Sequence, residues 1–191
     1  MQFKFDPLKT TQAAAILLSL RGGVMDRMRL LKLLYLADRE LLSARGRPLT
    51  GDRAVAMNHG PVLDQTYRLL KGDEQSPEDW NRYLRSVSKK VVLMGDPGFG
   101  ELSKTERNKL EEVSLRYQAI STLGLSALTH EFSEWIENFV PDTSQPIPWV
   151  DALKGTGDVG KIPAYEAKLR EQNLLDALFA NASADEVETG A

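Results

Sequence analysis

The fold is decided by the stretch RLLKLLYLADRE at residues 29–40, which is followed by AMNHGPV at residues 56–62. The apolar residues of the first stretch occupy too many angular positions for one stripe, and a helix that is apolar almost all round is buried on most sides. We therefore expect a helix from about Asp26 to Arg45 at the centre of the domain. Asp26 can cap its start, and Gly46 can supply its left-handed stop.

The second stretch predicts a sharp polar turn. Gly60 permits backbone angles closed to other residues, and Pro61 fixes φ near the helical value while lacking an N–H that a first helical turn leaves unpaired. We expect a new helix to start at Pro61, with Asn58 and His59 as capping or turn groups before it. The same polar groups, placed at the positive end of a helix dipole, form a candidate recognition element for an acidic or carbonyl-bearing partner group.

Weaker signals complete a mainly α-helical single domain with one small antiparallel hairpin. Residues 53–57 are short and alternating, so we expect them to be extended. The β-favouring run at residues 91–94 precedes a Gly-Asp-Pro-Gly turn signature, which predicts a hairpin from about Val91 to Leu102. Ser103 and Glu106 have the spacing of a capping box for the next helix.

Several of these motifs stand at set separations: KLLYLA at 32–37, GRPL at 46–49, HGPV at 59–62, and LTH at 128–130 with Trp135 close behind. Together they resemble the Panacea domain, the SocA-like or phage-associated antitoxin family, over Val24 to Phe139. The resemblance implies an antitoxin of a bacterial or phage toxin–antitoxin system that neutralises a cognate protein toxin by direct binding. Family members pair with unrelated toxins and one is implicated as a proteolytic adaptor, so it implies either occlusion of the toxin or its delivery to a protease.

The chain divides into four parts. Residues 1–140 form the Panacea-like helical domain, and residues 141–162 are rich in Pro and Gly and are expected to form a connector. Residues 163–180 predict an amphipathic helix that packs on the domain or on a partner. Residues 181–191 are small and acidic and predict a disordered tail.

Composition limits the partners and the location. The 191 residues carry a net charge of −3, which gives no overall attraction for nucleic acid. No stretch approaches the roughly 20 apolar residues of a membrane span, and the first residues lack the apolar run of a signal peptide. We expect a cytoplasmic protein that binds neither membrane nor nucleic acid. The sequence does not set its oligomeric state.

Chemistry-bearing motifs are few. Cys is absent, and His59 and His130 are the two histidines. We expect no metal, no cofactor and no catalytic residue, because no motif pairs a nucleophile with a base at recognisable spacing. The alternative is a small hydrolase or nuclease in which His59 and His130 converge as an acid/base pair. A transcriptional role would need a helix-turn-helix, which the sequence does not indicate.

The candidate partner-binding residues surround the two motifs. Tyr35 also has a structural interpretation as a core aromatic, as His130 does as a half-buried packing residue. The basic run from Arg82 to Lys90 is interpreted as a solvated face. The partner-binding hypothesis names Tyr35, Arg39, Asn58, His59, Gly60, Pro61, Tyr67 and His130.

Overall fold

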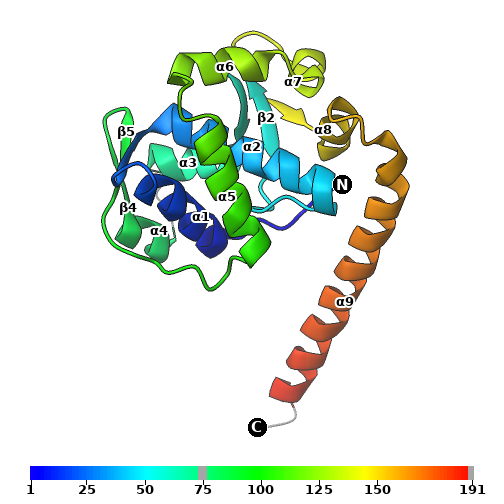
Figure 1. Ribbon diagram of the computed structural model, residues 1–191. Helices are drawn as coiled ribbons and strands as arrows, with labels where there is room; N and C mark the ends of the chain where they lie inside the picture. Colours follow the sequence, from blue (N-terminus) through cyan, green and yellow to red (C-terminus); the bar gives the residue numbers. More distant parts are fainter. Residues whose placement is uncertain (73–76, 189–191) are drawn as a thin grey trace.

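The body of the protein is built from helices packed around one buried helix, α2 (Figure 1). The computed structural model describes residues 1–72 and 77–188. Residues 73–76 and 189–191 lie outside this range. The helices of the described residues are α1 (Pro7–Ser19), α2 (Arg27–Arg45), α3 (Asp64–Lys71), α4 (Glu78–Tyr83), α5 (Lys104–Arg116), α6 (Thr122–His130), α7 (Ser133–Asn138), α8 (Trp149–Gly155), the short 3₁₀ helix η1 (Val159–Lys161) and α9 (Ile162–Glu188).

Short antiparallel sheets accompany the helices. One has the strand order β1-β5-β4 and the other β3-β2-β6, counted over the described residues. The fold is therefore mainly helical, as expected, but it is mixed: two three-stranded sheets replace the single small hairpin that was expected. The strands are β1 (Val24–Asp26), β2 (Ala54–Met57), β3 (Gly60–Leu63), β4 (Leu84–Val87), β5 (Lys90–Leu93) and β6 (Gln145–Ile147).

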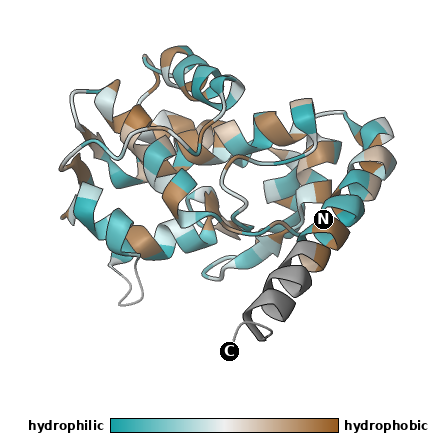
Figure 2. Cartoon of the chain, turned by 90° about the horizontal axis from the view of Figure 1, so that it is seen from below, coloured by the Kyte–Doolittle hydropathy of each residue, from teal (hydrophilic) through white to brown (hydrophobic). Residues whose placement is uncertain are grey.

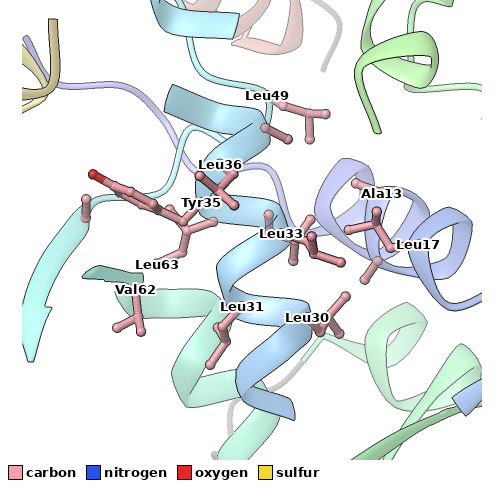
Figure 3. Packing of buried hydrophobic residues seen from close by; sticks show 14 of the residues in the cluster. Ala13, Leu17, Leu30, Leu31, Leu33, Tyr35, Leu36, Leu49, Val62 and Leu63 are labelled. Carbon is pink, nitrogen blue, oxygen red and sulfur yellow. The ribbon is translucent and has the colours of Figure 1, made fainter. Parts of the chain in front are cut away.

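The central helix is confirmed, together with the signals that bound it. The Asp26 carboxylate accepts hydrogen bonds from the backbone N–H of Met28, at 2.9 Å, and of Arg29. Gly46 ends the helix with φ +79°. Leu33 of α2 lies toward Ala13 and Leu17 of α1, while Val62 and Leu63 of β3 lie on another side (Figure 3). The all-round apolar sequence of α2 thus corresponds to packing on several faces.

Two further helix starts follow their sequence signals. Asp6 accepts from the backbone N–H of Lys9 at 2.9 Å and caps α1. At α5 the capping box is complete, since Ser103 and Glu106 each accept from the other's backbone N–H. Each cap joins residues three positions apart, and the spacing of Ser103 and Glu106 was sufficient to predict the capping box.

The expected helix start at Pro61 is wrong. Residues 60–63 form β3, which pairs antiparallel with β2 through a two-residue turn at Asn58 and His59, and α3 begins only at Asp64. Proline is tolerated here because β3 is an edge strand, so one side of its backbone needs no ladder partner. The extended character expected for residues 53–57 is confirmed for residues 54–57, which form β2.

The expected hairpin from Val91 to Leu102 is also wrong in its partner. β5 does contain Val91, but it pairs with the preceding strand β4 and with β1. The turn lies at Ser88 and Lys89, and Ser88 has φ +54°. Of β4 only Leu84 is buried, so its polar sequence gave little strand signal. The Gly-Asp-Pro-Gly segment leads into a loop before α5.

Residues 141–162 contain structure where a connector was expected. β6 pairs with β2 and completes the second sheet, and α8 follows at once. Trp149 of α8 is buried, and its indole N–H donates to the backbone oxygen of Asp52 at 3.0 Å. This segment therefore contributes to the hydrophobic core.

The last helix, α9, leaves the body and projects from it (Figures 1 and 2). Its start is anchored where Tyr165 packs against Gly46 and donates to the backbone oxygen of Ser43 at 3.0 Å. The helix continues to Glu188, whereas a disordered tail was expected from residue 181. None of the helices described, α9 included, is both long and apolar enough to cross a membrane.

Candidate functional site

The structure divides the eight candidate residues by accessibility. Asn58 and His59 are exposed at the tip of the β2–β3 hairpin, and Tyr67 of α3 is half-buried. Arg39 and His130 are also half-buried, whereas Tyr35, Gly60 and Pro61 are buried. A partner therefore has direct access to the hairpin tip and to α3, and not to Tyr35.

Asn58 fixes the hairpin tip to a distant loop. Its side-chain N–H donates to the Asp142 carboxylate at 2.7 Å, and its oxygen accepts from the Asp142 backbone N–H at 2.9 Å. The backbone oxygen of His59 accepts from the Ser126 hydroxyl of α6 at 2.8 Å. These bonds replace the helix-capping role expected for Asn58 and His59. The turn was also expected to lie at the positive end of a helix dipole, and this is wrong because α3 begins only at Asp64, beyond the turn.

An open hollow of about 730 Å³ lies beside the tip; we call it the tip groove. Its apolar lining includes Met28, Leu31, Met57 and Val62, and basic residues also line it. The ammonium group of Lys71 lies 5.2 Å from the ring centre of Tyr67. The groove brings together three predicted residues, Asn58, His59 and Tyr67, with three basic residues that were not predicted, Arg27, Lys71 and Lys89.

Beneath the tip lies Lys32, a buried lysine that the site prediction missed. Its side chain is 0% exposed, and its ammonium group donates to the backbone oxygen of Pro61 at 2.6 Å. Burial lowers the pKa of Lys32 to about 7. Gly60, at φ +92°, passes so close that a Cβ there would lie 2.7 Å from the Lys32 nitrogen and from the Thr129 hydroxyl oxygen. The sequence feature that could have identified Lys32 is its position as a lone lysine within an apolar run.

His130 lies against the inner side of the tip. Its ring stacks on Trp135 with centres 4.1 Å apart, and the Trp135 indole N–H donates to the Met57 backbone oxygen at 3.0 Å. Burial lowers the pKa of His130, and the positive charges of Lys32 and His59 lower it further. Its Nε2 is buried and has no hydrogen-bond partner among the residues described. His59 and His130 are therefore close enough to interact electrostatically. The ring of His130, however, is packed against Trp135 and supports the hairpin tip from inside.

Tyr35 and Arg39 converge on one buried carboxylate. Glu134 of α7 accepts from the Tyr35 hydroxyl at 2.9 Å and from Arg39 Nε at 2.5 Å. The Arg39 guanidinium also lies 4.1 Å from the centre of the Phe132 ring. This network joins α2 to α7, the helix that carries Trp135, and so helps to hold Trp135 against His130. Its role is structural.

Two buried aspartates fix the segment between α2 and the hairpin. Asp38 accepts from the backbone N–H of Leu49 and Thr50, and burial raises its pKa to about 7. Asp52 accepts from the backbone N–H of Gln65 and Thr66 and so caps α3 from outside the helix. Sequence spacing missed this cap because Asp52 lies twelve positions before the helix starts at Asp64.

One comparison with known proteins gave a match. A family model described as "Antitoxin SocA-like, Panacea domain" matches residues 30–136, more than half of the chain. The chain belongs to this family. No curated protein and no solved structure gave a match. Within residues 1–72 and 77–188, no group of three or more metal-ligating side chains is placed to hold an ion.

Proposed function

We propose that this protein is the antitoxin of a toxin–antitoxin pair and that it neutralises its cognate protein toxin by direct binding, without chemistry of its own. Family membership supports the antitoxin role. The observation that carries the binding mode is the tip groove, where accessible Asn58, His59 and Tyr67 meet around an apolar lining.

The composition of the groove indicates the kind of toxin segment it suits. An apolar lining with a few convergent polar groups is typical of binding sites, and anchor residues in such pockets carry most of an interface's binding energy. Arg27, Lys71 and Lys89 outnumber the two acidic lining residues, Asp26 and Asp142, which favours an acidic partner. We propose that the toxin places an apolar side chain in the groove and acidic groups against these cations.

The tip is held in one conformation before any partner arrives. Lys32 bonds the Pro61 oxygen, Ser126 bonds the His59 oxygen, and Asn58 bonds Asp142. A rigid recognition element loses little conformational entropy on binding. Once the toxin is bound, both occlusion and delivery to a protease are compatible with this surface.

Replacing His59 with alanine is expected to weaken toxin binding about tenfold, or roughly 1.4 kcal/mol, with little change in thermal stability. The reason is that the side chain is exposed while the backbone of His59 makes the structural bond to Ser126. Calorimetric titration would use the neighbouring gene product whose growth inhibition this chain rescues. Leu115→Ala on α5, exposed and outside the groove, is the control. Equal losses of melting temperature and affinity would instead assign His59 a structural role.

Neutralisation by the purified protein is expected to be stoichiometric. Toxin activity should fall in proportion to added protein until a fixed molar ratio is reached, because binding without turnover consumes one site for each toxin. An assay with only the two purified proteins excludes any protease. Lasting inactivation at strongly substoichiometric amounts, with a toxin mass altered by a covalent change, would show turnover and favour the hydrolase or nuclease alternative built on His59 and His130.

A further inference from the structure

The buried amine of Lys32 lies close behind the lining of the tip groove. Met28 lines the groove, and Lys32 follows it by one turn on the same face of α2. In the β2–β3 hairpin, His59 and Val62 line the groove, and the backbone oxygen of Pro61 between them accepts from Lys32 Nζ at 2.6 Å. One helical turn and one strand therefore separate this amine from a partner in the groove.

Lys32 is buried without a negative partner. Its side chain is 0% exposed, its bond to Pro61 is to an uncharged oxygen, and no carboxylate of the described residues pairs with it. A Cβ on Gly60 would lie 2.7 Å from both the amine nitrogen and the Thr129 hydroxyl oxygen, and 3.1 Å from a carbon of the His130 ring. Because an unpaired charge is unfavourable in such surroundings, burial lowers the pKa of Lys32 to about 7.

The carboxylates of the elements around this amine are engaged elsewhere or lie at the surface. Six of them are bonded to other groups of the chain: Asp38 and Glu40 of α2, Asp64 of α3, Glu134 of α7, and Asp26 and Asp142 at the groove. Glu131 and Glu137, at the ends of α6 and α7, are exposed. An acidic group brought by a partner would thus approach an amine that the described chain leaves without a counter-ion.

The neighbouring basic groups oppose a charge on Lys32 in the free protein. Positive charges on Lys32 and His59 lower the pKa of His130, in addition to the effect of burial, and this repulsion acts equally on Lys32. Arg29, one turn away on α2, is bonded to backbone oxygens beyond α5 and brings no negative charge. A carboxylate in the groove reverses the balance, because attraction to it stabilises the protonated amine.

We propose that Lys32 is the proton-binding residue of the tip groove: it takes up a proton from solvent when an acidic group of the partner enters, so binding strengthens as the pH falls toward neutrality. The inference rests on the proposed function, because the acidic group is that of the toxin. The bond from Lys32 to the Pro61 oxygen is kept in both protonation states, since either form of the amine can donate. Affinity stops rising once the free protein is itself protonated at Lys32.

Nuclear magnetic resonance of the full-length protein with ¹³C-labelled lysine observes the amine directly. One lysine side-chain signal should titrate near pH 7, and Lys32→Met should remove that signal. Addition of the neighbouring gene product whose growth inhibition this chain rescues should raise its midpoint by about one pKa unit. A Lys32 signal that titrates near its ordinary pKa of 10.5 in the free protein overturns the proposal.

Calorimetric titration with the same gene product measures the effect on binding. Wild type and Lys32→Met should bind equally at about pH 9, whereas at about pH 6 the wild type should bind up to about tenfold more tightly than the variant. Near pH 8, buffers of different ionisation enthalpy should show more proton uptake for the wild type than for Lys32→Met. Lys104→Met removes an exposed lysine of α5 outside the groove and should keep the wild-type uptake.

The comparison of the two proteins removes the titration of the toxin and of the histidines, which both share. Parallel pH profiles of affinity for wild type and Lys32→Met overturn the proposal, as does a wild type that binds more weakly than the variant at about pH 6. Binding that is tight but independent of Lys32 leaves the antitoxin proposal standing. Absence of binding at every pH overturns the proposed function, and this inference with it.

Discussion

Replacing Leu34 with alanine is expected to lower the free energy of unfolding by about 2–5 kcal/mol, which is a large share of the stability of a domain this size. Leu34 is completely buried in the middle of α2, the helix around which the others pack. The substitution removes apolar contacts and leaves a cavity that the surrounding helices, tied together by α2, can close only in part.

Chemical denaturation at equilibrium measures this loss as a lower midpoint with an unchanged slope. Leu115→Ala is the matched control, because Leu115 is exposed on α5 and its loss should change stability by less than about 0.5 kcal/mol. A midpoint that Leu34→Ala leaves unchanged would contradict the central position of α2 in the core.

Lys32→Met is expected to remove a strong pH dependence of stability between about pH 7 and pH 10.5. The pKa of Lys32 is about 7 in the folded protein and 10.5 in its ordinary state. Between these values the unfolded chain binds the proton and the folded protein does not, so wild-type stability rises with pH. The difference between these two pKa values corresponds to roughly 5 kcal/mol across the window.

Methionine approximates the length and shape of the lysine stem without its charge, so the variant should lack this rise. Free energies of unfolding of both proteins, measured at several pH values from 6 to 11, give the difference directly. Two other groups titrate outside this pH window. Burial lowers the pKa of His130 below its ordinary value of 6.5, and burial raises the pKa of Tyr35 well above 10.0. Parallel pH profiles for the two proteins would show that Lys32 does not experience the buried environment described above.

The features that were predicted correctly from the sequence depend on residues that are close to one another along the chain. The boundaries of α2 at Asp26 and Gly46 and the capping box at Ser103 involve residues two to four positions apart, and each chemical signal is complete in the sequence. The hydrophobic pattern of α2 was informative for the same reason, since too many of its faces are apolar for a surface helix.

The errors concern the pairing of strands. Pro61 has a backbone angle compatible with both a helix start and an edge strand, and the outcome depends on the pairing of β3 with β2. β2 in turn pairs on its other side with β6, which lies more than 80 residues further along. Likewise β5 has a clear strand sequence, but its partners are a polar strand before it and β1 near the start of the chain. Local propensity identifies a strand without naming its neighbours.

The same limit applies to the site. Asn58 and His59 were found because a polar turn next to an apolar helix is a local anomaly. Lys89 and Asp142 reach the tip groove from two separate segments further along the chain, and only the fold brings them there. Lys32 was visible as a charged residue in an apolar run, a pattern that indicates a buried amine when the helix is enclosed on all faces.

The return of the chain through β6 and α8 matters for anyone who moves this domain between proteins. Sequence similarity ends at residue 136, but the strand that covers the free edge of β2 and the indole that fills the space above Asp52 come from residues 145–149. A fragment cut at the limit of similarity would expose a row of unpaired backbone groups, which recruits strands from other molecules. Chimaeras that contain this domain therefore require a junction beyond Tyr165, which still contacts the end of α2 at Ser43 and Gly46.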